Sequence, residues 1–461
     1  MLSRVQFAFT IGFHILWPVL TIGLSAYLVL MEALWLKTAR EVYYRQARYW
    51  GRLFLLGFGL GVATGVVMAF QFGTNWAEFS RVSGDFFGNV LGFEATMAFA
   101  AEAAFLAIMV FGWHRVPRVI HMFATCVVAG GAALSAFWIM DASAWMQTPA
   151  GVQMQEGMIR VTSYVQAVFN PNLVVAFLHM WAACLETGLF FIAGISAWYL
   201  LKGRDAQLFL KSFRIALVLL IVLAPLQAYL GDASGLSVAR HQPAKLAAME
   251  GHWDTNPPGR GADWSVVAWP DAQAERNAFS VSVPYGLSIL TTHSLKGQVL
   301  GLKEFVPADR PPIALTYYSF RVMVLIGLIM VGLVAWALVG WRRGWLTPQA
   351  VGSHRWLLRA WVISVPLGFL AVETGWIVRE VGRQPWIVYG LLRTDQTVSA
   401  GLTAGQVEAS LATYVVIYSA LFVLFLAFAR KIVARGPDLD SPLPRPPRLF
   451  AEVPGGTGGE V

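Results

Sequence analysis

Long apolar segments separated by short polar connections dominate the chain. A helix needs roughly 20 residues to cross the hydrocarbon of a bilayer, and nine segments are long enough. Backbone polar groups in lipid must be paired within the segment, so each segment is expected to be an α-helix. The pattern therefore predicts an all-α polytopic membrane protein, a bundle of nine transmembrane helices. The expected spans are residues 10–33, 53–73, 91–113, 120–144, 173–201, 213–231, 315–341, 357–378 and 411–429.

Two stretches break this pattern and are expected to lie outside the membrane. Residues 232–314 are polar and rich in Pro, Gly and charged residues, and residues 435–461 form a Pro- and Gly-rich tail that is expected to be disordered. The chain thus divides into helices one to six (1–231), a long outer loop, helices seven to nine (315–434) and the tail. We find no internal repeat and expect no helix broken at the middle of the membrane.

Composition and charge agree with a membrane protein and orient it. Hydrophobic residues make up 57% of the 461 and charged residues 13%, and the mean hydropathy is +0.58. The formal charge of +8 comes mostly from Lys and Arg in alternate connections. Because basic residues favour the cytoplasmic side, the N-terminus is expected outside and the C-terminus in the cytoplasm. No continuous basic face exists, so nucleic acid is not an expected partner.

Several residues that hydrocarbon disfavours fall near one end of the expected spans. Taken singly, an intramembrane His is often a hydrogen-bond donor between helices, and a Met is usually core filler. Ionisable groups in spans nevertheless cost several kcal/mol each and usually mark a functional site. Because six such residues share one level of the membrane, we interpret them as a site. They are His14, Glu94, Glu102, His179 and Glu373, together with Met323, which is apolar but able to ligate a metal.

His, Met and carboxylates are groups that ligate metals, and haem is the cofactor that fits this set best. Haem iron accepts a His/Met axial pair for electron transfer, while iron held from one side keeps a position open for oxygen. Both cysteines, Cys126 and Cys184, lie in apolar spans and offer no cluster site. Arg379, Arg383 and Arg393 could neutralise haem propionates, although each could equally be an ordinary arginine at the membrane interface.

Three other functions deserve comparison with a haem oxidase. A haem–copper oxidase would need more intramembrane histidines, because only His14 and His179 of the eight lie well inside spans. A membrane di-haem electron carrier without oxygen reduction would lack a haem that binds carbon monoxide. A secondary transporter would favour inverted repeats and broken helices.

At several positions the chain resembles subunit I of cytochrome bd-type quinol oxidases. The matching segments are SRVQFAFT from Ser3, GVATGVVMAFQFGTNW at 61–76, WMQTP at 145–149 and GRQPW at 382–386. The eight-residue spacing of Glu94 and Glu102 also matches. The short loop before the seventh span is similar to the class that includes the cyanide-insensitive oxidases.

The resemblance implies a role for each candidate ligand. His179 and Met323 are implied as the axial pair of a low-spin haem b, with Arg321 beside it. His14 and Glu373 are implied as ligands of two high-spin haems, one b and one d or both b. The same resemblance implies that Glu94 and Glu102 lie beside the high-spin haems, where they ligate weakly or pass protons.

The outer loop contains HQPAKLAAMEGHWDT at 241–255, which resembles the quinol-binding loop of the family, with Lys245 and Glu250 as the substrate-contacting pair. Without the resemblance, a surface Lys–Glu pair on a short amphipathic helix would be the preferred interpretation. A carboxylate near the outer surface is suited to release the protons of a quinol outward.

The implied activity is a terminal oxidase of the bacterial cytoplasmic (inner) membrane. It oxidises quinol at the outer face, reduces O2 to water and generates a proton motive force without pumping. The implied partners are a multi-span subunit II and a small single-span subunit. Phe369 departs from the Trp of some relatives, and Asp141 and Glu186 match no common role. We hypothesise that Glu186, two turns after His179, joins a proton or hydrogen-bond path near the low-spin haem.

Overall fold

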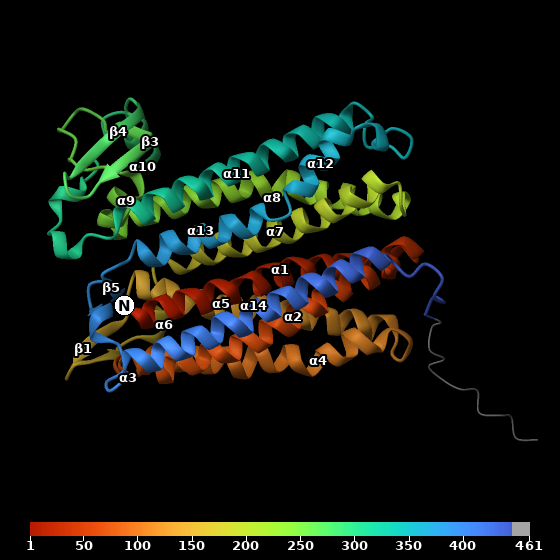
Figure 1. The fold of residues 1–461 in the computed structure, drawn as a ribbon, viewed down its shortest axis with the longest axis horizontal. Helices are drawn as coiled ribbons and strands as arrows, with labels where there is room; N and C mark the ends of the chain where they lie inside the picture. The colour runs from red at the N-terminus through yellow and green to blue at the C-terminus, as the bar shows by residue number, and fades with distance from the viewer. Residues whose placement is uncertain (445–461) are drawn as a thin grey trace, which may run out of the picture.

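The computed structural model describes residues 1–444, and most of the expected disordered tail lies outside these residues. Long helices lie side by side along the longest axis of the molecule, and a small cap of short elements covers one end (Figure 1). The N-terminus lies at this capped end, which we call the N-terminal end of the bundle.

Within residues 1–444, nine helical segments are long and apolar enough to cross a membrane, as predicted. Two of the nine contain an interruption. The segments are α1 (Leu2–Thr38), α2 (Glu41–Thr74), α3–η1–α4 (Ala77–Phe93, Glu94–Phe99, Ala100–Phe111), α5 (Arg118–Gln147), α7 (Leu173–Lys202), α8 (Ala206–His241), α11 (Ile313–Arg342), α12–α13 (Arg355–Ile363, Leu367–Val381) and α14 (Ala404–Arg435).

The third span begins earlier than expected. Its helix starts at Ala77 rather than near residue 91, because its first turns carry polar residues such as Glu78 and Asp85 and resemble a loop in the sequence. Glu94 therefore lies about 25 Å from the start of the helix, farther than a span beginning near residue 91 implies. A π-helix, η1, occupies Glu94–Phe99, and such wide turns are frequent at functional sites.

The eighth span is broken, contrary to the expectation of unbroken helices. The α-helix stops at Ile363 and resumes at Leu367, after Pro366. Proline has no backbone N–H and disfavours helical geometry in the residue before it, so the helix is interrupted there. A side chain at Gly368, just after the break, would meet Thr187 Oγ1 of α7 at 2.5 Å, so α13 starts in close contact with α7.

The long outer loop is shorter and more ordered than its composition suggests. The first residues expected in the loop continue α8 as far as His241, and α9 follows after one residue. The rest of the loop forms the cap in Figure 1. Three antiparallel hairpins complete the described fold. The short elements are β1–β2 (Val152–Gln155, Met158–Val161), α6 (Tyr164–Val168), α9 (Pro243–Glu250), β3–β4 (Trp264–Asp271, Arg276–Val283), α10 (Gly286–Thr292) and β5–β6 (Trp386–Val388, Leu392–Arg393).

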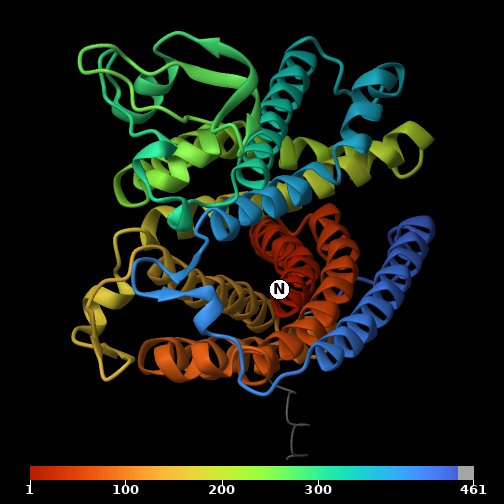
Figure 2. The same cartoon turned by 60° about the vertical axis from the view of Figure 1, so that its left-hand side comes forward.

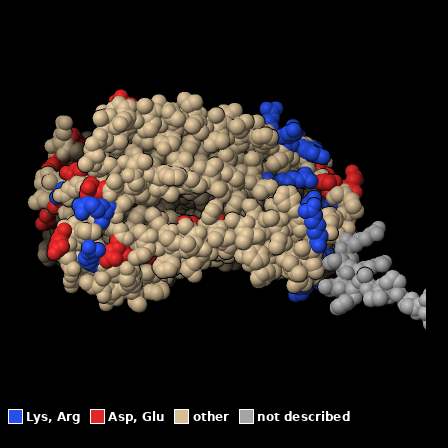
Figure 3. All heavy atoms as spheres, turned by 90° about the horizontal axis from the view of Figure 1, so that it is seen from below, with Lys and Arg blue, Asp and Glu red and all other residues tan. Residues whose placement is uncertain are grey.

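Helix α1 is central and α14 is peripheral. Protein buries 67% of the most apolar window of α1 but only 6% of that of α14, and Figure 2 shows α1 enclosed while α14 lies along one side. Charged side chains gather at the two ends of the face in Figure 3, and a hollow near its middle contains acidic side chains. The end opposite the N-terminus is mainly basic on this face.

Two glycines allow α1 and α7 to touch. A Cβ on Gly23 would lie 2.5 Å from Cys184 O and 2.8 Å from Gly188 Cα, and a Cβ on Gly188 would lie 2.7 Å from Gly23 Cα. Small residues let helix backbones approach closely, which is a main source of packing energy in membranes.

We therefore predict that Gly23→Val destabilises the protein by separating α1 from α7. Overpacking of this kind costs about 1–3 kcal/mol, and the apparent melting temperature of the purified protein should fall by several degrees. Gly130→Val is the control, because a Cβ on Gly130 meets nothing within 4 Å. Equal melting temperatures for the two variants would contradict the prediction.

Candidate functional site

One ring nitrogen of His14, Nδ1, is hydrogen-bonded within the protein, and the other, Nε2, is able to bind a metal. Its Nδ1 lies 2.8 Å from Thr64 Oγ1 of α2, and the Thr64 hydroxyl donates to Leu60 O at 2.8 Å. Since a hydroxyl has one hydrogen, we assign the imidazole proton to Nδ1, which donates to Thr64. Nε2 then has a free lone pair, the form of histidine that binds a metal. A Cβ on Gly65 would lie 3.1 Å from His14 Cε1, so the glycine leaves room beside the ring.

Glu373 of α13 reaches the same interface. A Cβ on Gly12 would lie 3.4 Å from Glu373 Oε2, which places this carboxylate against α1 two residues before His14. Its Oε1 is buried with no hydrogen-bond partner among the described residues. A buried carboxylate oxygen without a partner is costly, so this atom is suited to a cation or a metal.

His179 and Met323 lie on α7 and α11, and each faces a glycine of a neighbouring helix. A Cβ on Gly231 of α8 would lie 3.5 Å from His179 Cε1, and one on Gly375 of α13 would lie 3.0 Å from Met323 Sδ. His179 Nδ1 is buried without a partner within residues 1–444. Because glycine has no side chain, Gly231 and Gly375 leave space beside the ends of the His179 and Met323 side chains.

Glu94 is the first residue of η1, Glu102 lies three residues after its end, and both contact α5. Ser135 Oγ donates to Glu94 Oε1 at 2.6 Å. Glu102 is only 7% exposed, and a Cβ on Gly131 would lie 2.6 Å from its Cγ. Ser135 lies about 18 Å from the end of α5, and His14 lies the same distance from the start of α1, so Glu94 and His14 are at a similar depth.

Lys245 and Glu250 of α9 are buried, at 4% and 6% exposure, and are not a surface pair. Lys245 Nζ donates to Gln147 Oε1 at 2.5 Å and to Arg379 O at 3.1 Å. Glu250 Oε2 accepts from Arg321 Nη2 at 2.6 Å and from Trp264 Nε1 at 3.1 Å. The alternative of a Lys–Glu pair on the surface of an amphipathic helix is therefore wrong. Both side chains are buried, and each contacts a different partner.

Burial holds the pKa of Lys245 well below its ordinary value. Desolvation is the main cause, and the positive charges of Arg379 and Arg383 lower the pKa further, whereas Glu380 opposes them. A lysine in this setting can lose and regain a proton far more readily than one in water.

Two of the three arginines considered for haem propionates have free donors. Arg379 Nε donates to Ser143 Oγ at 2.8 Å and Arg383 pairs with Glu380. Arg379 Nη2 and Arg383 Nε and Nη1 remain buried without a partner among the described residues. Arg393 instead pairs with Asp309 and lies over the ring of Trp386, so its guanidinium group already has partners in the protein.

The comparisons with known proteins agree over nearly the whole chain. A family model described as cytochrome bd terminal oxidase subunit I matches residues 2–437. Cytochrome bd-II ubiquinol oxidase subunit 1 of Escherichia coli (strain K12) is 38% identical, covering 95% of this chain and 96% of its own. Cytochrome bd ubiquinol oxidase subunit 1 of Bacillus subtilis (strain 168) is 37% identical, covering 96% and 95%. The chain belongs to the cytochrome bd oxidase subunit I family.

A solved structure supports the same conclusion. The bd oxidase from Geobacillus thermodenitrificans matches with a TM-score of 0.86 and 29% sequence identity, covering 95% of this chain and 98% of the solved one. The chain is therefore a subunit of a haem-containing terminal oxidase of the bacterial cytoplasmic membrane, a quinol:O2 oxidoreductase. Neither the electron carrier without oxygen reduction nor the transporter is favoured.

The residues of this cytochrome bd subunit fit haem on structural grounds. The side chains of His14, His179 and Met323 each face a glycine, and Glu373 keeps one oxygen without a partner in the described part of the chain. Within residues 1–444, no group of three or more His, Cys, Asp or Glu side chains could hold a metal ion by itself. Iron in a porphyrin needs only axial ligands from the protein, and single His, Met and Glu side chains on separate helices are of the type that supplies them.

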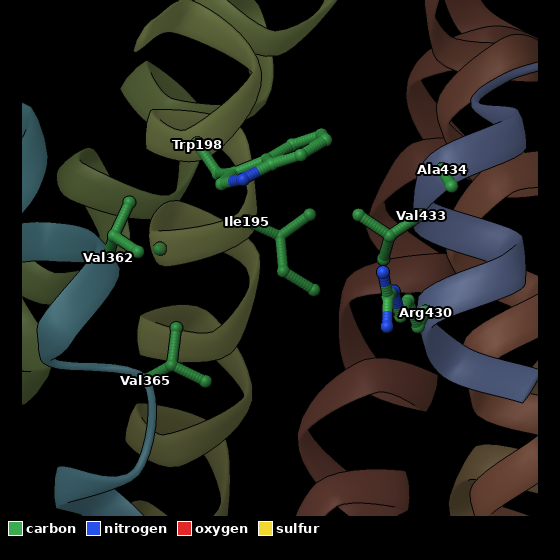
Figure 4. Close-up of a pocket in the computed structure, with 8 residues that line it drawn as sticks. Ile195, Trp198, Val362, Val365, Arg430, Val433 and Ala434 are labelled. Carbon is green, nitrogen blue, oxygen red and sulfur yellow. The ribbon is translucent and has the colours of Figure 1, made fainter. Parts of the chain in front are cut away.

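A cavity of about 480 Å³ lies elsewhere, between α7, the α12–α13 break and α14 (Figure 4). Ile195, Trp198 and Val365 line it together with Arg430 near the end of α14. None of the candidate ligands lines this cavity.

Sequence reasoning missed the residues that support the site. Gln147 stands in the WMQTP segment, and Thr64 and Gly65 stand in GVATGVV, yet these segments indicated only family membership. Asp141 Oδ1 accepts from Asn170 Nδ2 at 3.2 Å, which gives this unmatched carboxyl a local partner. Glu186 is buried in α7.

If His14 ligates a haem, as the resemblance implies, we predict that Thr64→Val weakens haem binding by removing the partner of Nδ1. Loss of such a supporting contact typically lowers affinity by about 10- to 100-fold. Haem content per protein should therefore fall, as measured by extraction and absorbance on the purified oxidase. Thr413→Val, at an exposed position of α14, should keep full haem content. Full occupancy in both variants would show that Thr64 does not support a ligand.

Proposed function

We propose that quinol is oxidised beside α9 and that its electrons pass to a low-spin haem b held by His179 and Met323, with Arg321 beside it. His14 and Glu373 then hold two high-spin haems, one b and one d or both b, where O2 is reduced. The matched relatives are named for ubiquinol and menaquinol, so a quinol of one of these classes is the proposed substrate.

The two contacts of α9 are the observation that carries the proposal. Glu250 pairs with Arg321, which stands two residues before Met323 on α11. Lys245 donates to the carbonyl of Arg379, which stands six residues after Glu373 on α13. A substrate between Lys245 and Glu250 would therefore lie next to α11, which carries the low-spin ligand Met323, and α13, which carries the high-spin ligand Glu373.

Each group has a defined chemical task. When bound, haem supplies the one-electron chemistry and the binding of oxygen. Lys245 and Glu250 bind the quinol oxygens and accept their protons, and Glu250 is held for this by Arg321. Glu94 and Glu102 deliver protons toward the oxygen site. Arg379 and Arg383 offer buried donors to the haem propionates.

The proposed orientation places the N-terminal end of the bundle outside. Basic side chains gather at the opposite end, as expected for the cytoplasmic side (Figure 3). Quinol protons would then be released outside while cytoplasmic protons are consumed with O2. This arrangement generates a proton motive force without pumping. The loop at 232–314 is then the extracytoplasmic quinol-binding region.

The proposed partners are a multi-span subunit II and a small single-span subunit. The curated relatives are named as subunit 1 or subunit I of an oxidase, which implies at least one further subunit. The apolar surface of α14 is almost entirely uncovered within the described residues and is available to lipid or to another helix.

For the haem assignment, we predict a b-type band and a CO-sensitive high-spin component in the reduced-minus-oxidised spectrum of membranes that contain the chain and subunit II. His179→Ala or Met323→Leu should remove the low-spin signal and spare the CO-sensitive one, because only the low-spin iron needs two strong axial ligands. His293→Ala, in the exposed part of the loop, is the control. An intact low-spin band in both ligand variants would contradict the assignment of His179 and Met323 as its ligands.

For the quinol site, we predict that Lys245→Ala lowers kcat/KM for quinol by about tenfold or more, since a hydrogen bond from a charged or strongly polar group is lost. Oxygen uptake with quinol measures this, and the haem spectrum should not change. Lys296→Ala is the matched control, because Lys296 is an exposed lysine of the same loop. Normal quinol kinetics in Lys245→Ala would place the substrate elsewhere.

A further inference from the structure

Gln147 is the last residue of α5 and lies in the centre of a buried polar cluster. It is 2% exposed. Its Oε1 accepts from Lys245 Nζ at 2.5 Å, and its Nε2 lies 3.1 Å from Arg379 O and 3.5 Å from Glu380 Oε1. Gln242, just before α9, donates from Nε2 to the backbone carbonyl of Gln147 at 2.9 Å. One side chain thus joins α5, α9 and α13.

These contacts define the orientation of the Gln147 amide. A backbone carbonyl can only accept, so the atom beside Arg379 O must be the nitrogen. The oxygen therefore faces Lys245, whose Nζ donates to it. Arg379 O accepts from both Gln147 and Lys245, and this closes a triangle of hydrogen bonds around the end of the lysine side chain.

With respect to residues 1–444, the triangle leaves one position on Nζ without a partner. The nitrogen is tetrahedral, with one bond to Cε and two hydrogens directed at Gln147 Oε1 and Arg379 O. In the neutral amine the remaining position is a lone pair that can accept a hydroxyl proton, and in the ammonium it is an N–H that can donate. The stem of the lysine is also confined, because a Cβ on Gly382 would lie 3.0 Å from Lys245 Cγ.

We propose that Gln147 is a positioning residue for quinol oxidation, which orients Lys245 Nζ so that its one free position meets a quinol hydroxyl. The inference rests on the proposed role of Lys245 as a quinol contact. In the step, the quinol O–H bond breaks and an N–H bond forms on Nζ, while one electron leaves the quinol for the oxidised haem of the enzyme. Gln147 touches no reacting atom and acts only through Lys245.

To accept a proton from quinol, Lys245 must be a neutral amine before the step, and its surroundings favour that form. Burial and two nearby arginines hold its pKa well below the usual range. The charged groups that act on Lys245 are Arg379, Arg383 and Glu380, and the neutral Gln147 of α5 bonds to it directly. The other elements packed against α9 carry groups that are engaged elsewhere. Arg321 of α11 pairs with Glu250, His241 of α8 bonds to Ser237 O, and Lys303 and Glu304 of the short helix at Leu302–Glu304 bond to Asp254 and Thr255.

The test compares Gln147→Leu with Gln147→Glu in the complete oxidase. The leucine variant removes the acceptor, so kcat/KM for quinol should fall about tenfold. In the glutamate variant a carboxylate next to Nζ favours the ammonium and raises the pKa of Lys245. The neutral amine then forms only at higher pH, so the rising limb of the kcat/KM profile should move to higher pH by about one unit or more.

Controls separate this inference from the quinol-site proposal. Gln153→Glu, at an exposed position of β1, should leave the pH profile unchanged. In the Lys245→Ala background, Gln147→Glu should produce no further shift, because the group through which it acts is gone. If Lys245→Ala is defective but both Gln147 variants behave like the wild type, the positioning role is wrong and the quinol site stands.

Two other outcomes would overturn the inference. If Lys245→Ala oxidises quinol normally, the quinol-site proposal and the role of Gln147 both fail. If both Gln147 variants lose the haem spectrum, Gln147 has a structural role and not the positioning role proposed here.

Discussion

A polar group inside an apolar bundle needs a partner, and this requirement decides how the helices of this protein meet. Lipid is as apolar as leucine, so apolar packing alone distinguishes poorly between neighbouring helices. Polar contacts are more selective. His14 joins α1 to α2 through Thr64, Ser135 joins α5 to η1 through Glu94, and Glu250 joins α9 to α11 through Arg321. Each contact fixes the register of two segments that are far apart in sequence.

The same requirement separates structural from functional polar groups. His121 and Glu32 form a buried pair at 2.8 Å, and His121 Nε2 lies 3.0 Å from Met109 O, so both ring nitrogens have partners. This pair behaves as a contact between helices. His179 Nδ1 and Glu373 Oε1, by contrast, are buried with no partner among the described residues. Another atom of each side chain, His179 Cε1 and Glu373 Oε2, lies beside a glycine of a different helix. A cofactor would satisfy such atoms.

Hydropathy and length predicted the number of spans because both depend only on local composition. The errors arose where local composition misleads. Polar residues at the start of α3 resemble a loop, and the effect of Pro366 depends on whether the helix can continue past it. The ligand candidates were recognisable because His and Glu are rare in hydrocarbon. Their supporting residues were not, since Gln147 is 98 positions from Lys245 and Thr64 is 50 positions from His14. Neither residue type is unusual in its own segment.

The end of α13 shows how a requirement of the fold becomes part of a site. The last carbonyls of any helix lack partners within the helix and carry partial negative charge. In α13 the carbonyl of Val378 accepts from Gly382 N, and that of Arg379 accepts from Gln147 and Lys245. The carbonyl of Arg379 at the helix end therefore accepts from the Lys245 amine of the proposed quinol site, and the same hydrogen bond gives this carbonyl a partner. Because the acceptor is a backbone oxygen, this contact does not depend on the side chain at position 379. It depends on where α13 ends, and the GRQPW segment that follows begins at the glycine that gives the lysine stem room to reach that carbonyl.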